Sequence, residues 1–242
     1  MDSRRFAYLK ALDIDVWERR NLDDPEVVAP MAVEDAPSAS LAPAVEPNVT
    51  QGLDWTGLER AIKTCTLCPL HASRTQGVFG VGNRQARWMI IGEAPGAEED
   101  RQGEPFVGRA GQLLNSMLKA IGLAREDVFI ANILKSRPPN NRDPRPEEVR
   151  ACIPYLFRQI ELVNPRLLLC VGRIAAQTLL DTDTTIGKLR GRVHHIVSGR
   201  PMIVTYHPAY LLRSPAEKRK VWTDLVLAMN TFERLGAEAR PS

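Results

Sequence analysis

The chain has 242 residues, of which 44% are hydrophobic and 25% are charged, as in an ordinary soluble globular protein. No apolar run approaches the length of a membrane span, and the first residues lack the apolar segment of a secretory signal. Four cysteines in a chain of this size argue against a disulfide scaffold, so we expect a cytoplasmic protein whose cysteines bind metal or pack in the core.

The net charge of +3 conceals an uneven distribution of charge along the chain. Residues 1–20 carry five basic and four acidic side chains, whereas residues 21–50 carry six acidic side chains and no basic ones. Residues 51–242 therefore hold 27 basic and 19 acidic side chains. A basic body of this kind suits a polyanionic partner such as a nucleic acid.

Two N-terminal segments differ in composition from the rest of the chain. Residues 1–22 include an expected amphipathic helix over 3–20, which either docks on the main domain or binds a partner. Residues 23–50 hold five prolines among alanine, serine and acidic side chains, so they cannot bury a core and are predicted to form a disordered linker. We expect residues 51–242 to form the main domain.

Short apolar runs alternate with helical spacing through the main domain. The runs predict buried strands at 88–91, 128–132, 167–171, 193–197 and 202–205. Helices are expected at 55–62, at about 110–122, from Pro146 on, after Gly172 and over about 215–235. Pro154 should perturb the helix that begins at Pro146. Strands alternating with helices indicate an α/β fold, a three-layer α/β/α sandwich with a central, largely parallel sheet.

The segment that follows the strand at 88–91 is unusually long and polar. Loops between a strand and a helix usually have about 2 to 6 residues, and longer ordered ones are usually functional. This segment also carries an apolar Phe106 among polar residues. Ligands of open α/β sheets bind beyond the carboxyl ends of the strands. Loops after three predicted strands carry Glu93, Asn132 and His207, which places the predicted site there.

Three motifs in these loops resemble those of a known enzyme family. They are Gly92-Glu93-Ala94-Pro95-Gly96 with Glu99-Asp100 and residues 105–111, the segment from Asn132 to Arg142, and His207-Pro208-Ala209-Tyr210-Leu211-Leu212-Arg213. In this order they resemble the type-4, iron–sulfur uracil-DNA glycosylases of the uracil-DNA glycosylase superfamily, over residues 55–230. The resemblance implies a DNA repair enzyme that hydrolyses the N-glycosidic bond of uracil in DNA and leaves an abasic site for base excision repair.

The resemblance assigns uracil binding to Gly92, Phe106, Asn132 and His207. Phe106 would stack on a uracil turned out of the duplex, and Asn132 offers the donor and the acceptor needed to read the uracil edge and reject cytosine. His207 would donate to uracil O2, where negative charge develops as the bond breaks. The structural alternatives are a loop plug for Phe106, a turn cap for Asn132 and a strand-end residue for His207.

Glu93 and Glu99 are the candidate catalytic carboxylates, together with His207. The sugar is expected to pass through an oxocarbenium-like state, which a carboxylate can stabilise or supply with an oriented water. Ala94 stands where related glycosylase families place a water-activating aspartate, so we expect no single strong base. Glu93 and the backbone of residues 92–96 are expected to share that task.

Basic side chains near the motifs are the candidate DNA contacts. Arg213 and Arg137 are expected to contact phosphates, and Leu212 or Leu211 to fill the space that the base leaves. Further candidates, each as easily a solvated surface charge, are Lys135, Arg142, Arg190, Arg192, Lys218, Arg219 and Lys220. With uracil-containing DNA as the partner, residues 1–22 become a candidate site for a replication or repair protein. We expect a monomer without membrane association.

A [4Fe–4S] cluster is the cofactor that the resemblance implies, normally held by four cysteine thiolates. Cys65, Cys68 and Cys152 match three ligand positions, but Ser136 stands at the fourth. A serine alkoxide ligand, a three-cysteine cluster, zinc on three thiolates and no metal at all are the open alternatives. We expect a structural cluster because three ligands are kept. Cys170 lies in an apolar run and is expected to be a buried strand residue.

Two other kinds of function are alternatives to hydrolysis. A glycosylase-like module that binds DNA or a replication partner without turnover is motivated by Ser136 and the N-terminal helix, but the catalytic candidates are intact. A nucleotide-cofactor enzyme is excluded because Gly80-Val81-Gly82 precedes the strand instead of following it, and neither a Rossmann nor a P-loop fingerprint is present. We therefore expect no nucleotide cofactor.

Overall fold

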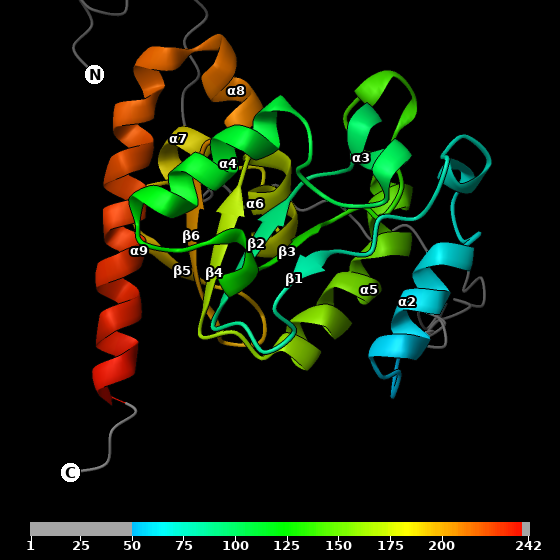
Figure 1. Ribbon diagram of the computed structural model, residues 1–242, viewed down its shortest axis with the longest axis horizontal. Coiled ribbons are helices and arrows are strands. Elements are labelled where there is room, and N and C mark those ends of the chain that lie inside the picture. Colours follow the sequence, from blue (N-terminus) through cyan, green and yellow to red (C-terminus); the bar gives the residue numbers. More distant parts are fainter. Residues whose placement is uncertain (1–49, 239–242) are drawn as a thin grey trace, which may run out of the picture. The chain divides into compact units, whose positions relative to one another are not determined.

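The computed structural model describes residues 50–238 (Figure 1). The predicted helix at 3–20 and, apart from Thr50, the predicted linker at 23–50 lie outside the described residues and stay predictions. Within residues 50–238, no helix combines the length and the apolar content needed to cross a membrane.

Within the described residues, six strands form one sheet in the order β1-β3-β2-β4-β6-β5 (Figure 1). The four central strands run parallel, and they are β2 (Trp88–Gly92), β3 (Phe129–Asn132), β4 (Leu167–Val171) and β6 (Pro201–Thr205). The edge strands β1 (Val81–Gly82) and β5 (Val193–His195) are antiparallel to their neighbours. The prediction of a largely parallel sheet is confirmed, and Cys170 is fully buried in β4 as expected.

Helices fill the connections before, between and after the strands. They are α2 (Trp55–Thr64), α3 (Ala97–Gln102), α4 (Arg109–Ala120), α5 (Pro146–Val163), α6 (Arg173–Leu180), α7 (Ile186–Leu189), α8 (Pro208–Arg213) and α9 (Lys218–Glu238). Short 3₁₀ turns lie at Pro69–Ala72, Arg125–Asp127, Pro139–Asn141 and Pro215–Glu217.

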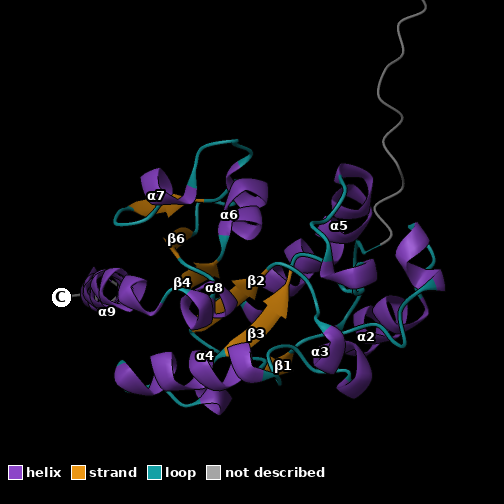
Figure 2. Ribbon diagram, turned by 90° about the horizontal axis from the view of Figure 1, so that it is seen from above, coloured by secondary structure: helices purple, strands orange, loops and turns teal. Residues whose placement is uncertain are grey.

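The central strands are apolar at consecutive positions because helices cover both faces of the sheet. Successive side chains of a strand point to opposite faces. Met89 and Ile91 of β2 therefore pack in the cluster with α2, α5, α6 and α7, whereas Trp88 and Ile90 pack with α4, α8 and α9. Figure 2 shows the two helical layers on either side of the strands. The predicted three-layer α/β/α sandwich is confirmed.

The register of β2 against β3 brings two motif residues together. Gly92 lies directly opposite Asn132 at the carboxyl edge of the sheet. The pairing continues beyond the strands, because the N–H groups of Ile133 and Leu134 donate to the carbonyls of Gly92 and Glu93 at 2.9 and 3.0 Å. The two loops that follow β2 and β3 are therefore fixed to each other where they begin.

Some elements differ from what the sequence led us to expect. Pro154 lies inside α5, which continues to Val163, so the helix does not end there, and the expected perturbation stays a prediction. The edge strand β1 and the helix α3 are too short to produce a clear periodicity. The terminal helix begins only at Lys218, because Pro215 opens a separate 3₁₀ turn.

Asp224 fastens α9 to the strand that leads into the third motif. Its fully buried carboxylate accepts the hydroxyl of Thr205 at 2.8 Å and pairs with the Arg190 guanidinium at 2.9 Å. Thr205 is the last residue of β6, two positions before His207, so this network fixes the strand end. Arg190 is engaged inside the fold, which corrects its prediction as a phosphate contact.

Replacing Asp224 by alanine should destabilise the fold by about 3 kcal/mol, because the buried Thr205 hydroxyl and the largely buried Arg190 both lose their acceptor. Urea unfolding at neutral pH measures this loss. Glu233→Ala, at an exposed position of the same helix, is the control and should change the free energy of unfolding by less than about 0.5 kcal/mol. A D224A variant as stable as this control would contradict the role given to Asp224.

Candidate active site

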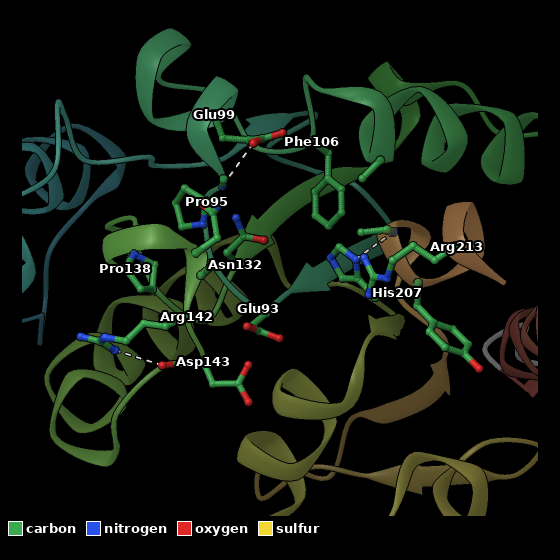
Figure 3. A pocket seen from close by; sticks show the side chains of 16 residues that line it. Glu93, Pro95, Glu99, Phe106, Asn132, Pro138, Arg142, Asp143, His207 and Arg213 are labelled. Atoms are coloured by element: carbon green, nitrogen blue, oxygen red, sulfur yellow. Dashed lines mark hydrogen bonds between the residues drawn. The ribbon is translucent and has the colours of Figure 1, made fainter.

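A cavity of about 450 Å³ opens at the carboxyl edge of the parallel strands (Figure 3). This volume lies in the range of small-molecule sites. The loops that follow β2, β3 and β6 all contribute to its walls. Among the lining residues are Glu93, Glu99, Phe106, Asn132, His207 and Arg213. The structure thus brings together the predicted site residues of all three motifs.

Asn132 ends β3 and points its side chain into the cavity wall. The residue is 3% exposed, and its Oδ1 atom has no hydrogen-bond partner among the described residues. Leaving such a buried atom without a partner costs about 1 to 3 kcal/mol, which a ligand with a matching donor would offset. The main-chain carbonyl of Asn132 accepts the Nζ–H of Lys135 at 2.7 Å, which fixes the strand end. The end of β3 is therefore held in place, while the side-chain Oδ1 of Asn132 is left without a partner among the described residues.

Gly92 leaves the room that Asn132 and Phe106 occupy. A Cβ atom at this position would lie 2.4 Å from Oδ1 of Asn132 and 2.6 Å from the ring of Phe106. Phe106 itself has a φ of 54°, a left-handed conformation that is costly for a residue with a side chain. Arg125 stabilises this conformation by donating to the Phe106 carbonyl at 3.2 Å. The strained backbone keeps the ring at the cavity wall.

His207 is the N-cap of α8, and its ring is held neutral. Its Nδ1 atom accepts the N–H of Ala209 at 3.1 Å, so in the neutral ring the proton lies on Nε2. Burial, together with the nearby Arg213 cation, lowers the pKa of His207 to about 4. The ring stacks on that of Phe106, with ring centroids 5.6 Å apart. At neutral pH the imidazole is an uncharged donor through Nε2.

Glu93 is the first residue after β2 and titrates near neutral pH. Burial, reinforced by the negative charge of Asp143, raises the pKa of Glu93 to about 7, and Arg173 opposes this rise. Arg173 also pairs with Asp143 at 2.8 Å, so both charges are held beside the cavity. A carboxyl group poised near neutrality is suited to accepting a proton from water.

Glu99 reaches the cavity, but its oxygens hold the loop together. Oε1 accepts the N–H groups of Val107 and Gly108 at 3.0 and 3.1 Å, and Oε2 accepts that of Gly96 at 3.1 Å. A single carboxylate thereby joins the start of the loop to its end and supports the segment that carries Phe106. The catalytic role expected of Glu99 stays a prediction.

Comparisons with known proteins place this cavity in a family. The profile described as the Uracil DNA glycosylase superfamily matches residues 79–226, which include all three motifs. The chain belongs to the uracil DNA glycosylase superfamily. It is similar to a curated type-4 uracil-DNA glycosylase of Archaeoglobus fulgidus, 49% identical over 172 residues that make up 68% of this chain and 86% of that protein. A curated protein of the same name from Thermotoga maritima is 44% identical over 178 residues, 72% of this chain and 93% of that protein. The expected membership in the type-4 family is confirmed.

The DNA contacts expected from the glycosylase resemblance lie near the mouth of the cavity. Arg213 is exposed and lines the cavity, and Leu212 beside it is 39% exposed. Leu211 is buried in the core cluster of α8, so of the two leucines Leu212 is the one available to enter a duplex. Arg137 lies on the loop after β3, where its Nε donates to Oδ1 of Asn141 at 2.8 Å. DNA contact by Arg213, Leu212 and Arg137 stays a prediction.

Lys135 is a buried residue, which corrects its prediction as a phosphate contact. It is 1% exposed, and its Nζ atom donates to the Asn132 carbonyl and, at 2.6 Å, to Oε1 of Gln159. The amide of Gln159 in turn donates to the Phe79 carbonyl at 2.7 Å. In this glycosylase fold the lysine supports the end of β3 from inside.

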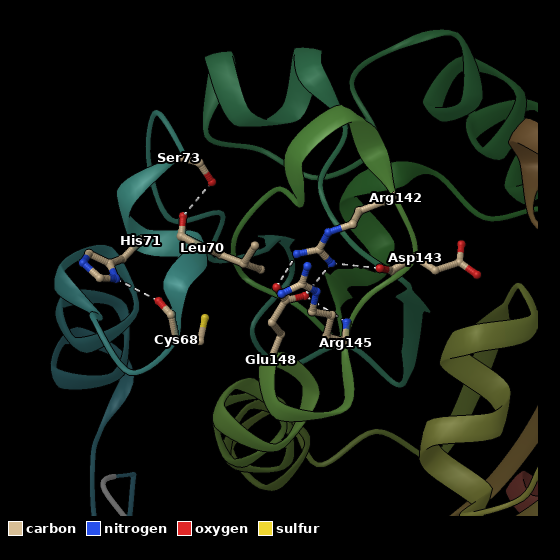
Figure 4. Close-up of polar contacts among 8 residues, drawn as sticks. All are labelled: Cys68, Leu70, His71, Ser73, Arg142, Asp143, Arg145 and Glu148. Carbon is tan, nitrogen blue, oxygen red and sulfur yellow. Dashed lines mark hydrogen bonds and ion pairs between the residues drawn. The ribbon is translucent and has the colours of Figure 1, made fainter.

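Asp143 and Arg173 are residues of the glycosylase site that sequence reasoning missed. Asp143 directly follows the second motif, and this position in the sequence could have indicated that it belongs to the site. Arg173 begins α6 and carries no local signal, because only the fold brings it to Asp143, with which it pairs. Arg142, which precedes Asp143, donates to the Glu148 carboxylate at 2.9 Å and ties the loop to α5 (Figure 4).

The four positions matched to cluster ligands hold three thiols and a hydroxyl. The neighbouring Cys68 thiol and burial together raise the pKa of Cys152. The hydroxyl of Ser136 accepts the Nη1–H of Arg74 at 2.7 Å. Within the described residues, no three Cys, His, Asp or Glu side chains are arranged to hold a metal ion. This donor set does not fit a cluster bound by four thiolates.

Replacing Glu93 by glutamine should stabilise the fold above neutral pH. The pKa of Glu93 rises from 4.5 to about 7 on folding, so ionisation opposes folding increasingly between these values and fully above them. Such a pKa shift is worth up to about 3 kcal/mol at pH 8, so thermal unfolding at that pH should show a midpoint at least about 3 °C higher for E93Q, the change expected for roughly 1 kcal/mol. At pH 4.5 the gain should nearly vanish.

The exposed Glu126→Gln is the matched control for this experiment and should show no such pH dependence. A gain by E93Q that is equal at both pH values would contradict the raised pKa of Glu93.

Proposed function

We propose that the protein is a uracil-DNA glycosylase, which hydrolyses the N-glycosidic bond of uracil in DNA and leaves an abasic site for base excision repair. The observation that carries the proposal is the unsatisfied, buried Oδ1 of Asn132 in a cavity that also holds Phe106 and a neutral His207. Similarity to proteins named type-4 uracil-DNA glycosylase supports the same substrate.

Asn132 reads the edge of the base in this proposal. Uracil presents an N3–H donor beside the O4 acceptor, which match Oδ1 and Nδ2 of the amide. Cytosine presents an acceptor at N3 and an amino group beside it, so both contacts would be lost or opposed. The base must leave the duplex to meet this amide, and Phe106 provides an aromatic face for it.

His207 stabilises the leaving base. As the bond between C1′ of the sugar and N1 of uracil breaks, its electron pair moves into the base and charge builds on O2. A donor placed there before the reaction stabilises that charge without reorganisation. Nε2 of His207 carries a proton at neutral pH because Nδ1 is occupied by the N–H of Ala209.

Glu93 orients the attacking water and takes its proton. The water oxygen forms the new bond to C1′, and the carboxylate form of Glu93 accepts the released proton. Ala94 offers no carboxylate, and the oxygens of Glu99 are occupied by three backbone N–H groups. We therefore give the proton-accepting role to Glu93 and the role of loop anchor to Glu99.

DNA would approach the mouth of the cavity, with Arg213 and Arg137 on phosphates and Leu212 in the space that the base leaves. Charge supports this, since residues 51–242 carry the basic excess of the chain. We propose that residues 51–242 act as a monomeric glycosylase domain in the cytoplasm. The amphipathic pattern of residues 1–22 supports a role in binding a replication or repair protein. No step of the proposed reaction runs through a cluster.

His207→Ala should lower the rate of uracil release about 100-fold or more, with a much smaller effect on DNA affinity. Single-turnover release from an oligonucleotide with one uracil gives the rate, and fluorescence anisotropy of the same oligonucleotide gives the affinity. His195→Ala, an exposed histidine outside the cavity, is the control. Equal losses of rate and affinity would refute the leaving-group role. No release by the unchanged protein despite DNA binding would favour the non-catalytic binding module.

Asn132→Asp should reduce the preference for uracil over cytosine at least about tenfold, or abolish release altogether. An aspartate loses the donor for O4 and gains an acceptor for the amino group of cytosine, and a difference of about 1.4 kcal/mol is tenfold. Competing oligonucleotides with uracil or cytosine at one position measure the preference. An unchanged ratio would remove Asn132 from base recognition.

A further inference from the structure

Ser136 stands in the protein interior, where a fourth thiolate would be needed for a cluster. It is 2% exposed, between the buried Lys135 and the half-buried Arg137. Its hydroxyl is not left unsatisfied there, because Nη1 of Arg74 donates to it at 2.7 Å. A serine hydroxyl is also a harder and weaker partner for iron than a thiolate. A hydrogen bond between Ser136 and Arg74 thus occurs at the position where a cluster would need its fourth thiolate.

Arg74 joins three separate parts of the chain through one side chain. Besides Ser136, its guanidinium donates through Nη2 to the carbonyls of Lys63 and Cys65 at 2.9 and 3.0 Å. Lys63 lies in the last turn of α2, and Cys65 is the C-cap of that helix. These bonds tie the helix end and the cysteine segment to the loop that follows β3. The planar, rigid fork of arginine suits such a junction.

One of the three thiols also contacts the loop that carries Ser136. The sulfur of Cys152 accepts the backbone N–H of Lys135, the residue before Ser136, at 3.5 Å. Cys152 lies in α5, so this bond joins that helix to the loop that follows β3.

We propose that the Arg74–Ser136 hydrogen bond takes the place of a fourth iron ligand in this protein, so that the glycosylase domain folds without a [4Fe–4S] cluster. The inference goes beyond the proposed activity, because it concerns what joins the cysteine segment to the site loop. Uracil release is measured on the same samples. Loss of the proposed activity would appear in that assay, whereas failure of this inference would appear as bound iron.

The metal content of the full-length protein, purified without oxygen, tests the first half of the proposal. We expect less than about one iron and one acid-labile sulfide per chain, whereas a complete cluster gives about four of each. Ser136→Cys, which restores the fourth thiol, should gain iron, sulfide and the visible absorption of an iron–sulfur cluster. Two or more irons per chain in the unchanged protein would overturn the proposal.

Thermal unfolding tests whether the bonds of Arg74 fasten the cysteine segment to the loop that follows β3. Arg74→Met removes all three side-chain bonds and should lower the midpoint by about 4 °C or more. Ser136→Ala removes only one bond and should give a smaller decrease, which keeps the test open if the first variant does not fold. Arg150→Met, an exposed arginine of α5, is the control and should shift the midpoint by less than about 2 °C.

An iron chelator should leave the midpoint of the unchanged protein where it is. A midpoint that falls with the chelator, or one that R74M and S136A leave unchanged, would contradict the fastening role of Arg74.

Discussion

The absence of a side chain at Gly92 is the constraint on which the pocket depends. The parallel register of β2 and β3 sets this glycine opposite Asn132. The space of a Cβ is then taken by the Asn132 amide and the Phe106 ring. Any larger residue would displace both groups, or separate the two strands. One hydrogen atom in place of a methyl group thus permits the Asn132 amide and the Phe106 ring to occupy the same small region.

Polar contacts of three ionisable side chains hold the loops around this point. Glu99 closes the loop after β2, Lys135 supports the end of β3 from inside, and Asp224 fixes the end of β6. Lys135 and Asp224 lie in the interior, and Glu99 is half-buried at the cavity wall. A buried polar group costs desolvation energy unless it is paired or hydrogen-bonded, and each of these side chains is. The loops around the site are consequently fastened by interactions that the chain itself supplies.

The sequence was sufficient for the sandwich, the central strands and the clustering of Glu93, Phe106, Asn132 and His207, because these depend on local apolar runs and on the rule that strand ends converge. It was insufficient to predict side-chain contacts whose partner comes from a distant segment of the chain. Lys135 and Arg190 look like surface charges in the sequence, yet Gln159 and Asp224 bind them in the interior. Arg173 pairs with Asp143, which lies 30 residues away in the sequence, and no local pattern reveals this contact.

In the proposed reaction, the uncharged state of His207 has a consequence for turnover. A cationic imidazole would attract the departing base anion with a full charge in a poorly solvated space, and so retain the product. A neutral donor would stabilise the same oxygen by a hydrogen bond alone, which weakens as soon as the base picks up a proton. Burial of this one ring would thereby couple the end of the chemical step to release of the base.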